Sequence, residues 1–436
     1  MNERDSEIIE QLLARSDYVL VGEPESADLI LINTCSIRDK AEQKVYSLLG
    51  QLAPLKKENP QLKIGVIGCV AQQEGDKICK RAPYVDLVVG TQQIYRIPSM
   101  LDRLANRETR REIATDLEGS FIIPAFQKLL QDKPPSPAPV EFRKFVTIMQ
   151  GCNNYCSYCV VPSTRGREIS RPVVDIVEEV RILIDQGVKE ITLLGQNVNS
   201  YGQTNAVDDR PVSFADLLHS VAGVPGLERL RFTTSNPKDL SEDLIGCFAE
   251  IDLLCPHFHL PVQSGSNHIL QRMNRKYTRE SYLEKVKALR KIRPDIALAT
   301  DIIVGFPGES NEDFARTMDL LETVRFHGSF SFKYSDRPNT RSADFPDKVP
   351  ESVKKERLQQ FQSRQDQISL EQNEKYVGTV QKVMVESGGD GKAKGRTGTN
   401  HIVHFPCSGD VHPGNTLDVQ ITRAGKHSLQ GKKTCK

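Results

Sequence analysis

The chain has 436 residues, of which 38% are hydrophobic, and 58 Lys and Arg residues stand against 57 Asp and Glu. This length predicts two or three domains rather than one. No apolar run approaches the roughly 18 residues that a membrane-spanning helix needs, and the acidic N-terminus lacks the basic and apolar regions of a signal peptide. We therefore expect a soluble, cytoplasmic protein without membrane association. Its ten cysteines would lie in a reducing compartment, where clustered thiols more often bind metals or do chemistry than form disulfides.

The net charge of +1 conceals an asymmetry along the chain. From Lys375 onward there are ten Lys and Arg but four Asp and Glu, a balance of +6, so the preceding residues carry −5. Cationic side chains bind polyanions partly by releasing counterions from phosphates. The basic C-terminal region is consistent with a polyanion partner and equally with a solvated basic surface, and charge alone does not separate the two.

The chain opens with a helical pattern. Ile8 and Ile9 recur with Leu12 and Leu13 at helical spacing, and Asn2 stands in front of them as the expected N-cap. This pattern predicts an amphipathic helix at the very start of the chain.

Three short apolar runs follow this helix, at 28–35 (DLILINTC), 63–69 (KIGVIGC) and 85–90 (VDLVVG). Continuous apolar runs of this length, separated by helical segments, are typical of buried parallel strands. Cys35 and Cys69 end the first two runs, and open α/β sheets usually build their sites at the carboxyl ends of strands. Residues 1–118 therefore form a predicted parallel α/β, Rossmann-like domain.

Four prolines within 134–139 predict a Pro-rich linker over 119–140. Beyond it, strand patterns alternate with helical ones through 141–373. The six strand patterns are KFVTIMQ, EITLLGQ, RLRFTTS, HFHLPVQ, IALATDIIVGF and SFSFKYS. This alternation predicts a parallel β/α barrel, complete or partial, with its site at the carboxyl ends of the strands.

The helical pattern stops near Tyr376. The segments YVGTVQKVMVES, HIVHFP and TLDVQITRA, separated by Gly-rich turns, predict a small all-β barrel over 374–436. The basic surplus thus lies on a β module of a kind that often binds nucleic acid.

The strongest chemical signal is MQGCNNYCSYC, which places Cys152, Cys156 and Cys159 in a C-x3-C-x2-C array directly after the first barrel strand. Three thiolates on one loop can bind three irons of a 4Fe-4S cluster and leave the fourth iron open. Tetrahedral zinc is the alternative, but a closed zinc site needs a fourth Cys or His ligand, and this loop offers none.

Polar residues also mark the predicted strand ends. Gln196 and Asn197 follow the second barrel strand, Ser235 follows the third, Gln263 follows the fourth, and Asp301 lies in the fifth. These side chains would face a cofactor pocket, although turn-forming and capping roles are common at such positions.

These motifs carry a resemblance to a known family. The cysteine loop followed by VVPSTRGREISRP is similar to the radical S-adenosylmethionine superfamily, in particular to its methylthiotransferase branch. The likeness extends over LINTCSIRDKAEQKV, GVIGCVAQQEG, LLGQNVNSYG, HLPVQSGSNHIL and DIIVGFPGES, and to a C-terminal module that resembles the TRAM domain. LINTCSIRDKAEQKV and LLGQNVNSYG resemble the MiaB type, which modifies tRNA, rather than the RimO type, which modifies a ribosomal protein.

The resemblance implies a reaction. The cluster on Cys152, Cys156 and Cys159 would bind S-adenosyl-L-methionine at its open iron, and reduction would yield a 5′-deoxyadenosyl radical. In MiaB-type enzymes that radical activates C2 of N6-dimethylallyladenosine at position 37 of tRNA. A second 4Fe-4S cluster, held by three cysteines, supplies or carries the sulfur. An adenine C2–H bond is inert to acid–base chemistry, which explains the need for such cofactors.

The resemblance also assigns residues. Cys35 and Cys69 match two of the three ligands of the second cluster, whereas without the family each would be interpreted as a buried inert thiol. Arg165 could pair with a carboxylate, either that of S-adenosylmethionine or that of a neighbouring structural acid. The basic residues of the TRAM-like segment would contact tRNA phosphates. They are Lys392, Lys394 and Arg396.

In the family, the first ligand of the second cluster precedes a Met-Asn pair that aligns with Met1 and Asn2. We therefore expect this chain to lack one interior strand of the sheet and its terminal cysteine, so that the second cluster is incomplete, and we expect an in-frame upstream sequence to encode them.

The expected partners are tRNA, a reductant protein of the flavodoxin or ferredoxin type and a sulfur donor system, with the chain itself a monomer. Two other functions stay open. One is methylthiotransfer to threonylcarbamoyl-adenosine tRNA or to ribosomal protein; the other is a non-catalytic, metal-stabilised RNA-binding protein.

Overall fold

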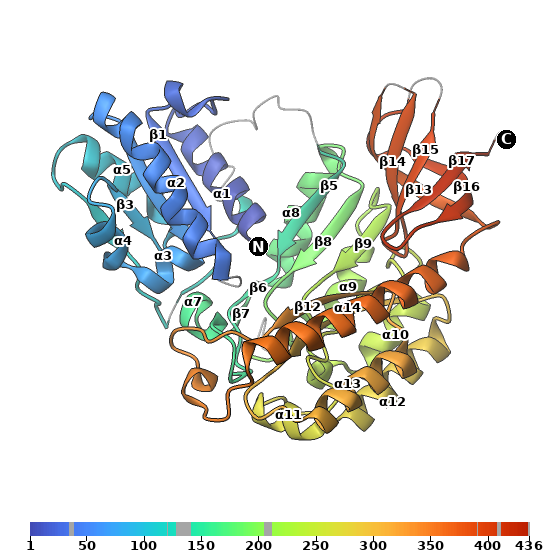
Figure 1. Cartoon of the computed structure of the whole chain (residues 1–436). Coiled ribbons are helices and arrows are strands. Elements are labelled where there is room, and N and C mark those ends of the chain that lie inside the picture. The colour runs from blue at the N-terminus through green and yellow to red at the C-terminus, as the bar shows by residue number, and fades with distance from the viewer. Residues whose placement is uncertain are drawn as a thin grey trace. The chain divides into compact units, whose positions relative to one another are not determined.

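The computed structural model (Figure 1) describes residues 1–34, 39–119, 121–127, 141–204, 212–389, 391–407 and 411–434. The chain divides into two compact units. The first comprises Met1–Ala138, Met149–Asn153 and Cys159–Arg171, and the second comprises Pro139–Ile148, Asn154–Tyr158 and Pro172–Lys436. The cysteine loop predicted to bind a cluster thus contributes residues to both units.

The first unit is built on a parallel sheet with the strand order β1-β2-β3-β4. The strands are β1 (Leu29–Thr34), β2 (Lys63–Gly68), β3 (Leu87–Val89) and β4 (Glu112–Ala114). Every residue of β3 is fully buried, and neighbours along a strand point to opposite faces, so both faces of the sheet are covered. The three apolar runs predicted as strands are confirmed. The sequence did not predict β4, because three residues are too few to show a pattern.

The helices described in the first unit are α1 (Asn2–Arg15), α2 (Asp39–Glu58), α3 (Cys69–Glu74), α4 (Asp76–Arg81), α5 (Ile97–Ala105) and α7 (Val161–Arg165). Of these, α2, α3, α4 and α5 lie between strands of the sheet. The first helix is confirmed, with Ile8 and Ile9 buried. The prediction that Asn2 caps it is wrong: Met1 occupies the N-cap position without a side-chain hydrogen bond. The Asn2 side chain instead accepts a hydrogen bond from Arg165, at 3.1 Å.

The second unit contains the six predicted parallel strands. They are β5 (Arg143–Thr147), β8 (Glu190–Leu194), β9 (Arg229–Phe232), β10 (His257–His259), β11 (Ala297–Val304) and β12 (Gly328–Lys333). They form two three-stranded sheets, β5-β8-β9 and β10-β11-β12, and an isolated parallel bridge pairs Leu230 of β9 with Leu254, which precedes β10. The predicted barrel is therefore confirmed in its partial form.

The run KFVTIMQ does not form one strand, as the sequence predicted. It divides into β5 and β6 (Met149–Gln150). β5 pairs with β8 in parallel, whereas β6 pairs antiparallel with β7 (Ile169–Ser170) in the first unit. Periodicity could not reveal this change of partner, since the residues stay apolar through it.

Helices alternate with the strands of the second unit. They are α8 (Val173–Asp185), α9 (Phe214–Ala222), α10 (Glu242–Glu250), α11 (Asn267–Arg272), α12 (Arg279–Ile292), α13 (Asn311–Val324) and α14 (Glu351–Glu374). Capping boxes begin α9, α12 and α13, where reciprocal hydrogen bonds satisfy backbone N–H groups of the first turn. The long helix α14 packs along β12 and also contacts the C-terminal strands (Figure 1).

The C-terminal residues form a closed barrel with the strand order β13-β14-β15-β17-β16. The strands are β13 (Val380–Gly389), β14 (Lys392–Thr397), β15 (Ile402–Pro406), β16 (Thr416–Ala424) and β17 (Leu429–Lys433). Val383, Val403 and Val419 meet in its core. The predicted all-β module is confirmed, and we call it the β barrel below.

Two arginines of β9 join the β barrel to the rest of the second unit. Arg229 donates to the carbonyl oxygens of Arg396, at 2.7 Å, and Lys382, at 3.0 Å. Arg231 donates to the carbonyl oxygen of Thr397, at 2.8 Å. Both arginines are buried, so these charge-assisted hydrogen bonds lie away from solvent and fix the ends of β13 and β14 against β9.

Most of the predicted linker, residues 128–140, lies outside the described residues, and the predicted domain boundaries stay predictions. Within the described ranges, no helix combines the length and the apolar character needed to cross a membrane.

Candidate active site

The loop with the three predicted cluster ligands begins at Gly151, directly after β6. Gly151 has a φ of +82°, and a Cβ there would lie 2.0 Å from the carbonyl oxygen of Arg167. Only glycine fits such a position without displacing the backbone. The N–H of Cys152 donates to the carbonyl oxygen of Gly166, at 3.3 Å. In the first unit, therefore, the start of the loop lies against the backbone that follows α7.

The middle of the loop belongs to the second unit and is held by the end of α11. The Ser157 hydroxyl donates to the carbonyl oxygen of Arg272, at 2.8 Å, and the Ser157 N–H to that of Met273, at 3.0 Å. The Asn274 amide donates to the carbonyl oxygen of Tyr155, at 2.8 Å. Tyr155 has a φ of +47°, which is uncommon for a residue with a side chain, and these contacts stabilise it there.

Arg275 reaches one of the predicted ligands. Its Nη1 donates to Cys156 Sγ at 3.4 Å, its Nε to the Tyr277 hydroxyl at 2.8 Å, and its Nη2 to the Pro261 carbonyl oxygen at 2.9 Å. The sequence did not single out Arg275. It stands 119 residues from Cys156, and no local pattern distinguishes it from Arg272 or Lys276.

The cysteines differ in accessibility. Cys152, Cys156 and Cys159 are partly exposed, whereas Cys69, Cys79, Cys247 and Cys255 are buried. Burial, assisted by the Glu250 carboxylate, raises the pKa of Cys247 to about 11, and burial also raises the pKa values of Cys79 and Cys255. Thiols in such surroundings are poor ligands and nucleophiles. The three loop thiols are thus better suited to bind iron than these three.

The described residues contain no group of three or more Cys, His, Asp or Glu side chains arranged to hold a metal ion. The assignment of a cluster to the loop therefore depends on the spacing of its cysteines and on their accessibility, and it stays a prediction.

Two predicted cofactor contacts leave polar atoms unsatisfied. The Asn197 amide donates to Asp239 Oδ2, at 2.7 Å, but Asn197 Oδ1 has no hydrogen-bond partner among the described residues, and neither has Ser235 Oγ. Both side chains are buried and follow the neighbouring strands β8 and β9. Buried polar groups are nearly always hydrogen-bonded, so these two atoms are suited to contact a polar ligand. Gln196 stands beside them and is partly buried.

Gln263, which follows β10, lies beside Asp301 in the middle of β11. The Gln263 N–H donates to the Asp301 carbonyl oxygen, at 2.8 Å, and Gln263 has a φ of +72°. Asp301 Oδ1 lies 2.9 Å from His259 Nε2, while His259 Nδ1 is buried without a partner among the described residues. A left-handed conformation at a buried non-glycine residue is strained, and such residues cluster at binding sites.

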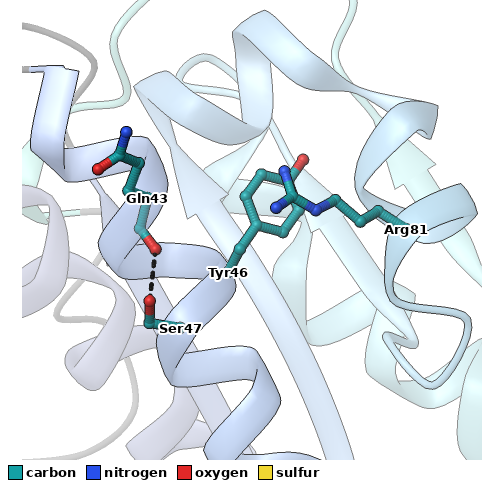
Figure 2. A pocket seen from close by; sticks show the side chains of 4 residues that line it. All are labelled: Gln43, Tyr46, Ser47 and Arg81. Carbon is teal, nitrogen blue, oxygen red and sulfur yellow. Dashed lines mark hydrogen bonds between the residues drawn. The ribbon is translucent and has the colours of Figure 1, made fainter.

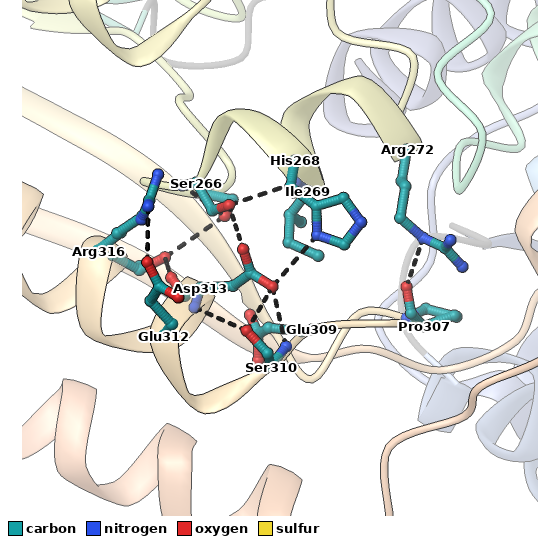
Figure 3. A network of polar contacts seen from close by, with 12 residues as sticks. Ser266, His268, Ile269, Arg272, Pro307, Glu309, Ser310, Glu312, Asp313 and Arg316 are labelled. Atoms are coloured by element: carbon teal, nitrogen blue, oxygen red, sulfur yellow. Dashed lines mark hydrogen bonds and ion pairs between the residues drawn. The ribbon is translucent and has the colours of Figure 1, made fainter.

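The loops that follow β10 and β11 are fixed to each other by Asp313, at the start of α13 (Figure 3). Its carboxylate accepts hydrogen bonds from the Ser266 hydroxyl at 2.5 Å and the Ser310 hydroxyl at 2.8 Å, and it lies 3.2 Å from His268 Nδ1. Burial would raise the pKa of Asp313, but these hydrogen bonds outweigh it and lower the pKa to about 2. The carboxylate therefore stays ionised and keeps the two loops together.

In the first unit, Cys69 begins α3, which packs against α7, the helix that ends with Arg165. Arg165 Nη2 donates to Asp5 Oδ2 at 2.6 Å. Burial alone would lower the pKa of Arg165, but Asp5 and Cys69 raise it above its usual value. Of the two predicted partners of Arg165, the described residues supply the structural acid. Cys35, the other predicted ligand here, lies outside the described residues.

The three basic residues predicted to contact RNA alternate along β14 and therefore share one face of it. Lys394 lies 3.2 Å from Glu386, and Arg396 lies 2.8 Å from the same carboxylate. Lys392 is exposed and has no carboxylate partner in the described part of the chain. Of the three, Lys392 is thus the residue whose charge is most available to a phosphate.

A surface pocket of about 290 Å³ lies between α2 and α4. Figure 2 shows the residues that line it, Gln43, Tyr46, Ser47 and Arg81, with the Arg81 guanidinium over the Tyr46 ring at 3.8 Å from its centroid. None of these residues is a cysteine or a predicted cofactor contact, so the pocket is separate from the predicted chemistry.

Three protein-family models match the chain. The Radical SAM superfamily matches residues 146–321, the TRAM domain matches residues 374–434, and Uncharacterized protein family UPF0004 matches residues 1–90. Among solved structures, that of the radical S-adenosylmethionine methyltransferase TsrM from Kitasatospora setae superimposes with a TM-score of 0.54 at 14% identity, covering 78% of this chain and 67% of that one. At this identity the likeness concerns the fold alone. The partial barrel and the matched superfamily together define the chain as a radical SAM protein.

Curated relatives narrow this class. The tRNA-2-methylthio-N(6)-dimethylallyladenosine synthase of Desulfotalea psychrophila is 59% identical over 99% of this chain and 96% of its own length. The synthases of Syntrophobacter fumaroxidans and Geobacter metallireducens are 50% and 47% identical, each over 99% of this chain and over 93% and 95% of their own lengths. The chain belongs to the family of tRNA-2-methylthio-N(6)-dimethylallyladenosine synthases.

Proposed function

We propose that the chain is a radical SAM tRNA methylthiotransferase that inserts a methylthio group at C2 of N6-dimethylallyladenosine at position 37 of tRNA. One observation carries the proposal: the C-x3-C-x2-C loop follows the first barrel strand in a chain that is 59% identical, over nearly its full length, to a synthase of that name. When bound, a 4Fe-4S cluster and S-adenosylmethionine supply radical chemistry, which the inert C2–H bond requires.

The chain's own residues divide the work of binding. Cys152, Cys156 and Cys159 would hold the cluster, and three protein ligands would leave one iron open for S-adenosylmethionine. Asn197 and Ser235 each present a buried oxygen without a partner among the described residues. A buried polar atom left unpaired costs about 1–3 kcal/mol, and a polar cofactor would satisfy both. We assign Gln196, Gln263 and Asp301 to the same pocket.

The first unit has a second role in the proposal. Cys35 and Cys69 would hold the cluster that provides the sulfur. We assign Arg165 to a structural role in the first unit rather than to S-adenosylmethionine, because its guanidinium already pairs with Asp5. Lys392 and Lys394 would contact tRNA phosphates. The proposal also includes two partners, a low-potential reductant of the flavodoxin or ferredoxin type and a sulfur donor system. We further propose that the chain is a monomer in the cytoplasm.

The test is anaerobic reconstitution with iron and sulfide, followed by incubation with S-adenosylmethionine, a reductant and tRNA that carries N6-dimethylallyladenosine. Mass spectrometry of the digested tRNA should detect the 2-methylthio nucleoside. Cys156→Ala should abolish both this product and 5′-deoxyadenosine. Cys69→Ala should still release 5′-deoxyadenosine but give no methylthio product. Cys407→Ala, in the β barrel, is the matched control and should retain both activities.

Other outcomes of the same assay would redirect the proposal. Methylthio product only on threonylcarbamoyl-adenosine tRNA or on ribosomal protein would change the substrate. Stoichiometric zinc with almost no iron, and no 5′-deoxyadenosine, would refute catalysis and leave an RNA-binding protein.

A further inference from the structure

Arg275 is placed against the cysteine loop by the same segment that holds Ser157. It lies just beyond the end of α11 and is partly buried. Its guanidinium makes hydrogen bonds through three nitrogens, to the Cys156 sulfur, the Tyr277 hydroxyl and the Pro261 carbonyl oxygen. The Tyr277 hydroxyl in turn donates to the Val262 carbonyl oxygen, at 2.9 Å. These hydrogen bonds therefore fix both the position and the orientation of the Arg275 guanidinium.

The charge of Arg275 has no carboxylate partner in the described part of the chain. Arg165, the other arginine beside a predicted ligand, pairs with Asp5, whereas the groups that contact Arg275 are a phenol, a carbonyl and a thiol. A guanidinium stays protonated in proteins, and a cation withdrawn from water is costly unless an anion lies nearby. Among its three contacts, the sulfur of Cys156 is the one that becomes anionic when it binds iron.

We propose that Arg275 is a positioning residue that orients the Cys156 thiolate and raises the reduction potential of the cluster bound there. The inference rests on the proposed function, since it needs a cluster on Cys156. On reduction, one electron passes from the external reductant to the cluster, and the site becomes more negative by one unit with no other bond made or broken. A fixed cation and an N–H···S hydrogen bond stabilise the more negative state more strongly. They therefore favour the reduced form, from which catalysis begins.

The test is a potentiometric titration of the reconstituted full-length protein, with chemical mediators and dithionite as the reductant, followed by electron paramagnetic resonance. The component that changes on addition of S-adenosylmethionine reports the cluster with the open iron. The wild type is compared with Arg275→Gln, which removes the charge, and with Arg275→Lys, which keeps it. Arg272→Gln is the matched control, because Arg272 donates to the Pro307 carbonyl oxygen, at 2.9 Å, and makes no hydrogen bond to a cysteine among the described residues.

We expect the midpoint of Arg275→Gln to move to a more negative potential, with Arg275→Lys between it and the wild type and Arg272→Gln unchanged. A tenfold smaller ratio of reduced to oxidised cluster at a fixed potential corresponds to about 59 mV for this one-electron couple. Lower iron content in Arg275→Gln than in Arg272→Gln, at equal melting temperature, would also support a counter-charge.

Two results would overturn the inference. One is an unchanged midpoint in Arg275→Gln with full iron content. The other is an equal loss of iron in Arg275→Gln and Arg275→Lys, because the lysine variant keeps the charge. A wild type without any cluster that responds to S-adenosylmethionine would instead refute the proposed function itself, so the two failures are distinguishable.

Discussion

Arg165 and Asp5, which stand 160 residues apart, form a buried ion pair in which Arg165 Nη2 lies 2.6 Å from Asp5 Oδ2. Their side chains are only 3% and 7% exposed. The pair joins α7, which follows the cysteine loop, to α1 at the start of the chain. Because α7 also packs against α3, the pair lies in the same part of the first unit as Cys69, a predicted ligand of the second cluster.

Removing one partner of this pair should destabilise the first unit. Asp5→Asn leaves the Arg165 charge buried with a weaker acceptor, and breaking a buried pair in this way costs about 3–5 kcal/mol. Hydrogen exchange of the β1 to β3 amides in the full chain measures the effect within that unit. Asp76→Asn is the control, since Asp76 pairs with Lys80 on the surface, where solvent screens the pair and its contribution to stability is small. Equal effects of the two substitutions would contradict this account.

A second buried pair should stabilise the loop after β11. Arg357 Nη1 lies 2.7 Å from Glu309 Oε2, and the side chains are 7% and 1% exposed. The same carboxylate oxygen accepts from the Gly305 N–H, at 2.7 Å. Burial raises the pKa of Glu309 despite these contacts. Arg357→Met removes the counter-charge, so we expect a loss of about 3–5 kcal/mol in the free energy of unfolding.

A double substitution distinguishes the loss of the pair from the loss of packing. Glu309→Gln combined with Arg357→Met removes both charges, and it should be less destabilising than the sum of the two single changes. The measurement is denaturant unfolding of the three variants. Additive losses would show that Glu309 and Arg357 act independently.

Acid should weaken the contact between the partial barrel and the β barrel. Burial, with a contribution from His401, lowers the pKa of His327 to about 3, and burial, with a contribution from Arg396, lowers that of His401 to about 4. The unfolded chain protonates both rings near pH 6.5, whereas the folded chain keeps them neutral. The free energy of unfolding is therefore highest above about pH 6.5. It falls as the pH drops from there toward 4, by about 1.4 kcal/mol per pH unit for each histidine.

The melting temperature between pH 8 and pH 5 measures this dependence. His327→Asn removes one titrating ring and should reduce the slope. His401→Asn removes the other ring and should also reduce the slope. An identical slope in wild type and His327→Asn would exclude His327 as a source of the pH dependence.

If the β barrel contacts tRNA phosphates, Lys392→Ala should weaken binding to all tRNAs alike. It should also reduce the slope of log affinity against log salt concentration by about one. Lys426→Ala is the matched control, because Lys426 in the same barrel already pairs with Asp366 of α14, at 3.1 Å. Filter binding at several salt concentrations provides the measurement, and equal slopes for both variants would argue against a phosphate contact at Lys392.

The order of elements could be predicted from the sequence because it depends on local patterns. Apolar runs such as those of β1 and β2 are short and continuous, and the Pro-rich segment and the switch to β structure near Tyr376 are changes in composition. The predictions that failed did so because contacts between distant parts of the chain overrode the local pattern. Asn2 does not cap α1 because Arg165 engages its side chain, and Met149 and Gln150 leave the run of β5 to pair with β7.

The residues of the candidate site also differ in whether a local sequence pattern or a tertiary contact reveals them. Cys152, Cys156 and Cys159 were identifiable because metal-binding spacing lies within one loop. Arg275 and Asp5 were not, because each acquires its role from a residue more than a hundred positions away. The two ion pairs that Lys394 and Arg396 form with Glu386 could not be predicted from the sequence either, because they depend on how β13 and β14 pair.

The two arginines of β9 have a consequence for how an RNA would be chosen. Arg229 and Arg231 fix the β barrel to the strand that precedes Ser235. If tRNA binds the β barrel as proposed, the distance from its bound phosphates to the cofactor pocket is fixed. A nucleotide would then reach the pocket only if it lies at that distance from those phosphates in the folded RNA.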